Sequence, residues 1–252
     1  MSLTLEDLGF TSISGKVVLL TGASSGMGRC TAVLLAKAGV KLCLMARRKE
    51  RLDELSQEIE KESSMKPLTF TGDVRDEHAC NECVAACINE FGRIDVLINN
   101  AGVGYPTDLE TVDTATYKAM MENNVDGVVF MTRAALPQLK KQKKGDIIMI
   151  SSPAGWRANP VAPLYCSSKF ALEGYTEGLR LQLNQLHEKG IHIRVMNILP
   201  GATNSEYWGE RNVPRDKFMT SEEMGSVILQ AVATKETVLV KNYQVEEFRY
   251  GQ

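Results

Sequence analysis

The fold is decided by Thr21-Gly22-Ala23-Ser24-Ser25-Gly26-Met27-Gly28, a glycine-rich segment that follows an apolar run at 16–21 and precedes a helical pattern at 29–38. Strand, glycine-rich turn and helix in this order are typical of a dinucleotide-binding βαβ unit. Gly22 permits a tight turn, Gly26 lets backbone approach a pyrophosphate, and Gly28 allows close helix packing. The N–H groups and positive dipole at the helix start favour a phosphate. The alternative is a purely structural turn.

Short apolar runs alternate with longer helical patterns along the chain, which is typical of βαβ units that build a parallel sheet. Most runs are continuously apolar, as strands covered on both faces should be. We therefore predict one α/β domain, 1–252, with a Rossmann-type, doubly wound parallel sheet of about seven strands and helices on both faces. The expected strands are Lys16–Thr21, Lys41–Ala46, Leu68–Thr71, Val96–Asn99, Asp146–Ser151, His192–Leu199 and Thr237–Val240.

The expected helices lie between these strands, at Met27–Ala38, Lys49–Glu62, Asp76–Phe91, Thr114–Lys140, Tyr165–Lys189 and Ser221–Ala233. Residues 1–14 are predicted to form an N-terminal extension. The least regular stretch is 201–219, and a long irregular segment in a compact domain is a candidate lid or substrate loop.

The composition favours a small-molecule partner. The chain has a formal net charge of -2 and 24% charged residues, so it lacks the basic excess that drives binding to nucleic acid or anionic membranes. Its start carries Glu6 and Asp7 and no long apolar run, which argues against a signal peptide or a membrane anchor. We expect a cytoplasmic protein.

Three cysteines, Cys80, Cys83 and Cys87, lie close enough in sequence to suggest a metal site, with His78 as a further candidate ligand. However, positions 80, 83, 84, 87, 88 and 91 follow the i, i+3, i+4, i+7 pattern of a helix that buries one face. We predict that these thiols pack in the core as small hydrophobes and that no metal is bound.

The end of the second expected strand indicates the type of cofactor. An acidic residue there binds the ribose hydroxyls of NAD, but this chain has Ala46 followed by Arg47 and Arg48. A guanidinium fits a phosphate ester, so NADP(H) is favoured over NAD(H). The alternative is that one or both arginines are solvated charges, and Ser25, directly before the second glycine, adds no basic side chain.

Tyr165 and Lys169 are four residues apart in a helical pattern, so they share one helix face. A phenol of pKa about 10 must approach about 7 to exchange protons efficiently at neutral pH. A positive charge about 4 Å away supplies about 4 kcal/mol at an effective dielectric constant of about 20. We therefore predict that Lys169 lowers the pKa of Tyr165, which acts as general acid and base.

The glycine spacing Thr-Gly-x-x-x-Gly-x-Gly and the motif Tyr165-Cys-Ser-Ser-Lys169 resemble the classical short-chain dehydrogenase/reductase family over nearly the whole chain. The resemblance implies a catalytic Ser152, thirteen positions before the tyrosine, whose hydroxyl binds the substrate oxygen. It further implies that Asn124 holds a water molecule behind Lys169, which itself binds the nicotinamide ribose.

The same resemblance implies the remaining cofactor contacts. The cofactor-binding set is Thr21, Gly22, Ser24, Ser25, Gly26, Met27, Gly28, Arg47, Arg48, Asp73, Val74, Asn100, Ala101, Gly102, Tyr165, Lys169, Pro200, Gly201 and Thr203. Asn99 has two open roles, structural or cofactor-binding, and Ser205 stands where the family usually has threonine. A sugar-nucleotide epimerase would need a different glycine spacing and a longer substrate domain.

The resemblance implies an NADP(H)-dependent oxidoreductase that transfers a hydride to or from a carbonyl or secondary alcohol carbon, assembled as a homodimer or homotetramer. The alternatives are oxidation of a hydroxy acid or sugar alcohol as the main direction, and a non-catalytic NADP-binding sensor or scaffold. Arg157 is either a carboxylate ligand or a solvated charge. The residues expected to shape a partly apolar substrate pocket are Pro153, Trp156, Arg157, Tyr207 and Trp208.

Overall fold

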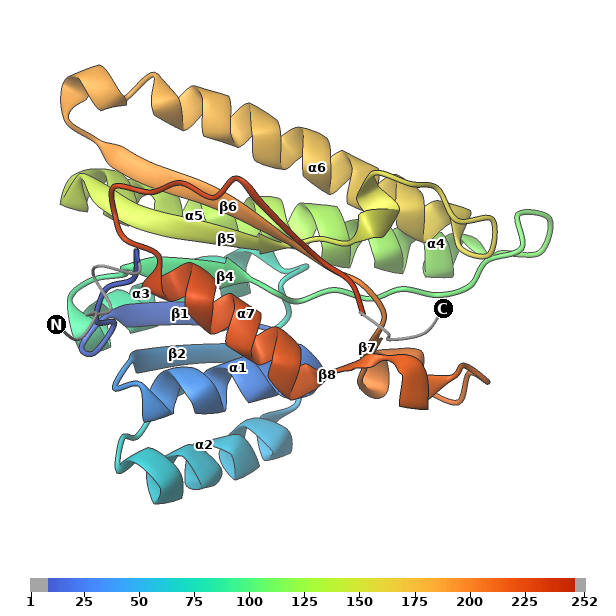
Figure 1. The fold of residues 1–252 in the computed structure, drawn as a ribbon, viewed down its shortest axis with the longest axis horizontal. Helices are drawn as coiled ribbons and strands as arrows, with labels where there is room; N and C mark the ends of the chain where they lie inside the picture. The colour runs from blue at the N-terminus through green and yellow to red at the C-terminus, as the bar shows by residue number, and fades with distance from the viewer. Residues whose placement is uncertain (1–8, 248–252) are drawn as a thin grey trace, which may run out of the picture.

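The fold is one parallel sheet covered by helices on both faces (Figure 1). A computed structural model describes residues 9–247. Within them, the main sheet has seven strands in the order β3-β2-β1-β4-β5-β6-β9. Their bounds are β1 Val17–Thr21, β2 Lys41–Ala46, β3 Leu68–Thr71, β4 Val96–Asn99, β5 Lys144–Ile150, β6 His192–Pro200 and β9 Asn242–Val245.

The helices divide into two sets, each with its own buried core. Helices α1 (Gly26–Lys37), α2 (Lys49–Ser63) and α7 (Ser221–Ala233) cover one face of the sheet, and α3 (Glu77–Phe91), α5 (Gly127–Gln142) and α6 (Pro163–Asn184) cover the other. Because aliphatic strand residues alternate between the two cores, both faces are apolar. No helix in residues 9–247 combines the length and apolarity needed to cross a membrane.

The predicted strand at Thr237–Val240 is wrong, because the seventh strand, β9, begins at Asn242. Arg194 donates hydrogen bonds to the carbonyls of Thr234, Lys235 and Val238, so this segment forms a loop. The apolar residues Val238 and Leu239 are consequently exposed. The alternation of core-facing and outward-facing residues that marks the seventh strand begins later in the chain. There Tyr243 and Val245 pack against the core, and β9 pairs with β6.

The single helix predicted at Thr114–Lys140 is interrupted. Helix α4 (Thr114–Met121) passes into a π-helical turn, Glu122–Asp126, before α5 begins. Such π turns occur frequently at functional sites. The helix predicted at Tyr165–Lys189 begins two residues earlier, at Pro163, because proline is favoured in the first turn. It ends at Asn184 and is followed by a short 3₁₀ turn.

The irregular segment after β6 is fixed at both of its ends. Strands β7 (Thr203–Asn204) and β8 (Met219–Thr220) pair in parallel, and two 3₁₀ turns, Glu206–Trp208 and Arg215–Lys217, lie between them. The part of the expected N-terminal extension that is described, 9–14, also packs on the domain: Phe10 forms an isolated bridge with Thr234. The rest of that extension, 1–8, lies outside the described residues.

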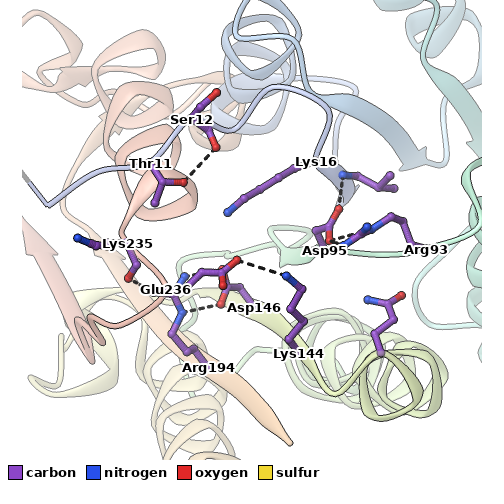
Figure 2. Close-up of polar contacts among 12 residues, drawn as sticks. Thr11, Ser12, Lys16, Arg93, Asp95, Lys144, Asp146, Arg194, Lys235 and Glu236 are labelled. Atoms are coloured by element: carbon purple, nitrogen blue, oxygen red, sulfur yellow. Dashed lines mark hydrogen bonds and ion pairs between the residues drawn. The ribbon is translucent and has the colours of Figure 1, made fainter. Parts of the chain in front are cut away.

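Charged residues are paired toward the amino ends of the strands (Figure 2). Asp146 on β5 receives hydrogen bonds of 2.7 Å from both Nε and Nη2 of Arg194, its register partner on β6. Asp95 accepts a bond from the backbone N–H of Val17 at 2.8 Å and also contacts Arg93. These contacts join the start of β1, β4, β5 and β6, so this end of the sheet is structural.

The chain order reverses between β1 and β4, which are neighbours in the sheet but are separated in sequence by β2 and β3. In open α/β sheets the ligand crevice lies beyond the carboxyl ends of the strands at such a switch point. The ends of β1 and β4 are Thr21 and Asn99, so the glycine-rich segment opens into this crevice.

Candidate functional site

The glycine-rich turn has the backbone that its sequence predicts. Gly22 and Gly26 have φ angles of 66° and 53°, in the left-handed region that favours glycine. A Cβ on Gly28 would lie 2.4 Å from the carbonyl oxygen of Gly22. No acidic residue stands in the first turn of α1, so its N–H groups face the crevice without a competing side-chain charge.

The turn after β4 is bonded to the turn after β1. Thr21 Oγ1 accepts hydrogen bonds from the backbone N–H groups of Asn100 and Ala101 at 3.0 and 3.1 Å. The amide of Asn100 donates to the carbonyls of Thr21 and Gly22 at 2.9 and 3.2 Å. Asn99 donates to the buried hydroxyl of Thr132 on α5, so of its two open roles the structure supports the structural one.

A groove of about 710 Å³ runs along the glycine turn. Arg48 lies over its rim, where Nη2 donates to Ser24 Oγ at 3.0 Å and to Ser25 Oγ at 2.8 Å. Arg47 and Asp73 line the same groove. Burial alone would raise the pKa of Asp73, but hydrogen bonds from Arg75 hold that pKa below its ordinary value, so the carboxylate is ionised.

Tyr165 and Lys169 lie together near the start of α6, as predicted, with Lys169 Nζ 5.8 Å from the centre of the Tyr165 ring. The ammonium group is buried and donates to the carbonyl oxygen of Ile150, the last residue of β5, at 3.0 Å. Ser152 follows that strand, and its Oγ accepts a bond from the N–H of Ala154. All these groups except Ile150 were identified from sequence.

The predicted downward shift of the Tyr165 pKa is not found. Burial raises the pKa of Tyr165 well above its ordinary value, a charge on Tyr207 would raise it further, and only the Ser152 hydroxyl opposes this. Burial also lowers the pKa of Lys169, to about 8, against the influence of Glu173. Because the Lys169 ammonium is directed to a carbonyl, it does not offset the burial of the phenol.

Asn124 lies in the π-helical turn and is buried. Its amide donates to the carbonyl of Val103 at 2.8 Å and to Ser168 Oγ at 2.9 Å, and its Oδ1 accepts from the N–H of Val103 at 2.8 Å. Both Oδ1 and Lys169 Nζ border Gly102, since a Cβ on that glycine would lie 3.2 Å from the first atom and 3.9 Å from the second. Asn124 therefore connects the turn after β4 to α6.

A second cavity, of about 650 Å³, adjoins the groove and is lined by Ser152, Tyr165 and Lys169. Pro200, Gly201 and Thr203 line this cavity and not the groove. Of the five residues predicted for the substrate pocket, four line it: Pro153, Arg157, Tyr207 and Trp208.

Trp156 is the exception, and its prediction is wrong. The 3₁₀ turn Pro153–Gly155 directs its side chain outward, where Nε1 donates to Glu173 at 2.9 Å and nearly half of the residue is exposed. Arg157 does line the cavity, but its guanidinium forms an ion pair with Glu246 and is largely exposed.

Sequence reasoning missed two residues that shape this cavity, Gly104 and Arg211. A Cβ on Gly104 would fall 1.9 Å from the Tyr207 hydroxyl, so glycine is needed for Tyr207 to approach Tyr165, whose ring centre is 6.0 Å away. Arg211 lies over the rings of Tyr207 and Trp208 and donates to the carbonyl of Gly104. The sequence contained a signal for Gly104, because a glycine directly follows the Asn99–Val103 turn. No comparable sequence signal indicated Arg211.

The cysteines of α3 pack as predicted. Cys80, Cys83 and Cys87 are fully buried against the sheet, and Cys83 Sγ lies 3.9 Å from Cys43 Sγ. Burial raises the pKa of Cys80 to about 12. His78 faces away and contacts Glu82. Within residues 9–247 no group of side chains is arranged to hold a metal ion.

Comparison with known proteins agrees with this geometry. Residues 16–216 match the family model described as short chain dehydrogenase. An uncharacterized oxidoreductase of Staphylococcus saprophyticus is 39% identical over 195 residues, which is 77% of each chain. The NADP-dependent 3-hydroxy acid dehydrogenase of Schizosaccharomyces pombe is 35% identical over 243 residues, covering 90% of this chain and 91% of that one.

Solved structures show the same fold. An alcohol dehydrogenase from the archaeon Thermococcus sibiricus, complexed with 5-hydroxy-NADP, superposes with a TM-score of 0.81 at 26% identity, covering 94% of this chain and 100% of that one. The L-sorbose reductase of Gluconobacter frateurii, complexed with NADPH and L-sorbose, gives a TM-score of 0.82 at 25% identity, covering 93% and 96%.

Proposed function

The chain belongs to the short-chain dehydrogenase/reductase family of oxidoreductases, and on this premise we propose that it transfers a hydride between NADP(H) and the carbon of a carbonyl or secondary alcohol. One observation carries the proposal. Ser152, Tyr165 and Lys169 line one cavity, and that cavity shares Asn100 and Gly102 with the groove along the glycine turn. A substrate oxygen and a dinucleotide can therefore meet there.

The groove residues fit a nicotinamide dinucleotide. The turn has no Cβ at positions 22, 26 and 28, and a Cβ at Gly22 or Gly28 would meet backbone or Asn100 atoms within 3 Å. We assign the pyrophosphate to this turn and the nicotinamide end to Gly102, Tyr165, Lys169 and the residues after β6. When bound, the nicotinamide supplies or accepts the hydride.

Tyr165 is the proton donor in the reductive direction and the acceptor in the oxidative direction. Its raised pKa keeps the phenol protonated at neutral pH, which suits donation to a substrate oxygen. The Ser152 hydroxyl stabilises the negative charge that develops on the same oxygen. Lys169 contributes a buried positive charge to the same cavity, and we assign it to the nicotinamide ribose.

Asn124 is a positioning residue for Lys169. Its three hydrogen bonds join Val103 to Ser168, one residue before the lysine. We assign to it the further role of holding a water molecule that connects the Lys169 ammonium to solvent, because Oδ1 accepts only one of these bonds and, like Lys169 Nζ, borders Gly102.

The proposal is tested with Tyr165→Phe. The general acid is then absent, so kcat should fall by about 10²- to 10⁴-fold, while NADPH binding measured by fluorescence titration should be retained. Tyr117→Phe is the matched control, because Tyr117 is exposed on α4, and it should keep full activity. Full turnover in Tyr165→Phe would reject the mechanism. A non-catalytic sensor predicts NADPH binding with no turnover of a carbonyl panel in either wild type or variant.

The preference for NADP(H) rests on Arg48, whose guanidinium is held at the groove rim by Ser24 and Ser25. Guanidinium groups suit phosphate esters, and the 3-hydroxy acid dehydrogenase relative is named as NADP-dependent. Arg48→Gln should weaken NADPH binding by about tenfold and NADH binding much less. Equal weakening of both cofactors would contradict the assignment of Arg48 to the 2′-phosphate.

Oxidation of a hydroxy acid is the second candidate activity, and Arg157 is the observation that favours it. Its position in the substrate cavity allows it to bind a carboxylate if the pair with Glu246 opens. Arg157→Gln should then raise KM for carboxylate substrates and leave KM for neutral ketones unchanged. If KM changes for neither substrate class, Arg157 is a solvated charge and not a carboxylate ligand.

We also propose a cytoplasmic homodimer or homotetramer. The free cysteines suit a reducing compartment. The apolar residues Val128 on α5 and Leu172 and Leu179 on α6 are buried in the core, so they do not contribute to an interface. Exposed apolar side chains on α6, Phe170 and Leu181, are better candidates. Light scattering on wild type would test the assembly.

A further inference from the structure

A carboxylate from the segment between β7 and β8 lies on the arginines at the rim of the groove. Glu206 Oε2 is 3.2 Å from Nη1 of Arg48, and Glu206 Oε1 contacts Nη1 of Arg51 on α2. The two arginines lie about 160 residues earlier in the sequence, at the start of α2. Arg51, and then Arg48, hold the pKa of Glu206 below its ordinary value, so the carboxylate is charged at neutral pH.

The contact lies where the proposed function assigns the 2′-phosphate. The guanidinium of Arg48 that meets Glu206 also donates to Ser24 and Ser25, and all four residues line the groove. A guanidinium has a limited set of donors in a fixed plane. A carboxylate and a phosphate ester therefore compete for the same face of Arg48, and they also repel each other.

We infer that Glu206 is a specificity-determining residue of the cofactor site, which weakens the preference for NADP(H) by competing with the 2′-phosphate for Arg48. The inference rests on the proposed function, because it requires that Arg48 bind this phosphate. NAD(H) carries a hydroxyl at that position, so it neither displaces Glu206 nor meets the repulsion. Glu206 thus weakens the binding of NADP(H) and leaves the binding of NAD(H) almost unaffected.

The effect should be moderate. The side chains of Glu206, Arg48 and Arg51 are each at least 40% exposed, and ion pairs at such exposure are weak and screened by salt. Displacing the carboxylate from Arg48 therefore costs little, and repulsion from the nearby phosphate is screened as well. Glu206→Gln, which keeps the shape and removes the charge, should strengthen NADPH binding by about three- to tenfold.

The experiment is titration of the full-length protein with NADPH and with NADH, following cofactor fluorescence at low and at physiological salt. Glu206→Gln is compared with wild type and with Asp216→Asn, an exposed carboxylate of the same segment that lines neither the groove nor the cavity and whose loss should change neither Kd. In Glu206→Gln the Kd for NADPH should fall and the Kd for NADH should change by less than about twofold. The gain should shrink as salt rises.

Arg48→Gln and the double variant Arg48→Gln/Glu206→Gln distinguish a failure of the inference about Glu206 from a failure of the proposed 2′-phosphate site at Arg48. If Arg48→Gln weakens NADPH binding selectively but Glu206→Gln leaves it unchanged or weakens it, then Glu206 does not compete and the inference is overturned. If Arg48→Gln has no selective effect, the proposed assignment of the 2′-phosphate fails first. Where the inference holds, the gain from Glu206→Gln is smaller in the Arg48→Gln background.

Discussion

Replacing Lys169 with methionine should abolish activity and yet stabilise the fold at neutral pH. The side chain is 5% exposed, and burial lowers its pKa from 10.5 to about 8. Each tenfold change in proton affinity is equivalent to about 1.4 kcal/mol, so keeping this lysine charged at pH 7 destabilises the folded state by about 3 kcal/mol. Methionine has a similar length and carries no charge.

The substitution also removes the hydrogen bond from Lys169 Nζ to the carbonyl of Ile150. A lost hydrogen bond that leaves a buried acceptor without a partner costs about 1 to 3 kcal/mol. The net effect of Lys169→Met is then a gain of up to about 2 kcal/mol in the free energy of unfolding at pH 7. Urea denaturation of the cofactor-free protein, followed by fluorescence, measures it.

The pH dependence of the stability difference shows whether it comes from the buried charge of Lys169. Since the pKa is lower in the folded state, the unfolded state binds more protons between about pH 8 and pH 10.5, and wild type gains stability as pH rises through this range. The methionine variant lacks this gain, so its advantage is complete below pH 8 and disappears by about pH 10.5. Lys118→Met, at an exposed position on α4, should show no such dependence.

A difference between Lys169→Met and wild type that is constant from pH 7 to pH 10 would refute the reasoning, because the destabilisation would then not come from the buried charge. A variant that is less stable at every pH would show that the hydrogen bond to Ile150 outweighs desolvation.

Three further outcomes are expected. Gly28→Ala should weaken NADPH binding and destabilise the fold by about 1 to 3 kcal/mol, measured by titration and urea denaturation, because the new Cβ would lie 2.4 Å from the Gly22 carbonyl oxygen. Asp146→Asn should cost about 2 to 4 kcal/mol in urea denaturation, because it leaves the guanidinium of Arg194, 11% exposed, without its carboxylate (Figure 2). The kcat/KM for carbonyl reduction should be level at neutral pH and fall as pH rises through about 8, where Lys169 loses its charge; a pH–rate profile checks this, and a level profile to pH 10 would contradict it.

Local sequence patterns predicted the parts of the fold that depend on local physics. Six of the seven strands follow from short apolar runs, most of which are continuous. The glycine turn follows from backbone conformations that only glycine adopts readily. The last strand did not, because the run Val238–Val240 is as apolar as a strand. What excludes it is the guanidinium of Arg194, more than forty residues earlier, which binds the carbonyls of that segment.

The π-helical turn was not predicted from the sequence for a related reason. Its sequence, Glu122–Asp126, has ordinary helical periodicity, and nothing local requires an i to i+5 pattern. The turn is associated with Asn124, whose amide reaches Val103 and Ser168 on other elements. Those bonds exist only once β4 and α6 have come together, so the contact pattern of Asn124 is a tertiary property that local sequence patterns do not reveal.

Burial moves Tyr165 and Lys169 in opposite directions on the pH scale, because it disfavours the anion of one and the cation of the other. A phenol held neutral is a competent acid, whereas a phenolate is needed to accept a proton. The raised pKa of Tyr165 suits the proposed reductive direction, and we expect the oxidative direction to require a source of positive charge closer to Tyr165 than the ammonium directed at Ile150.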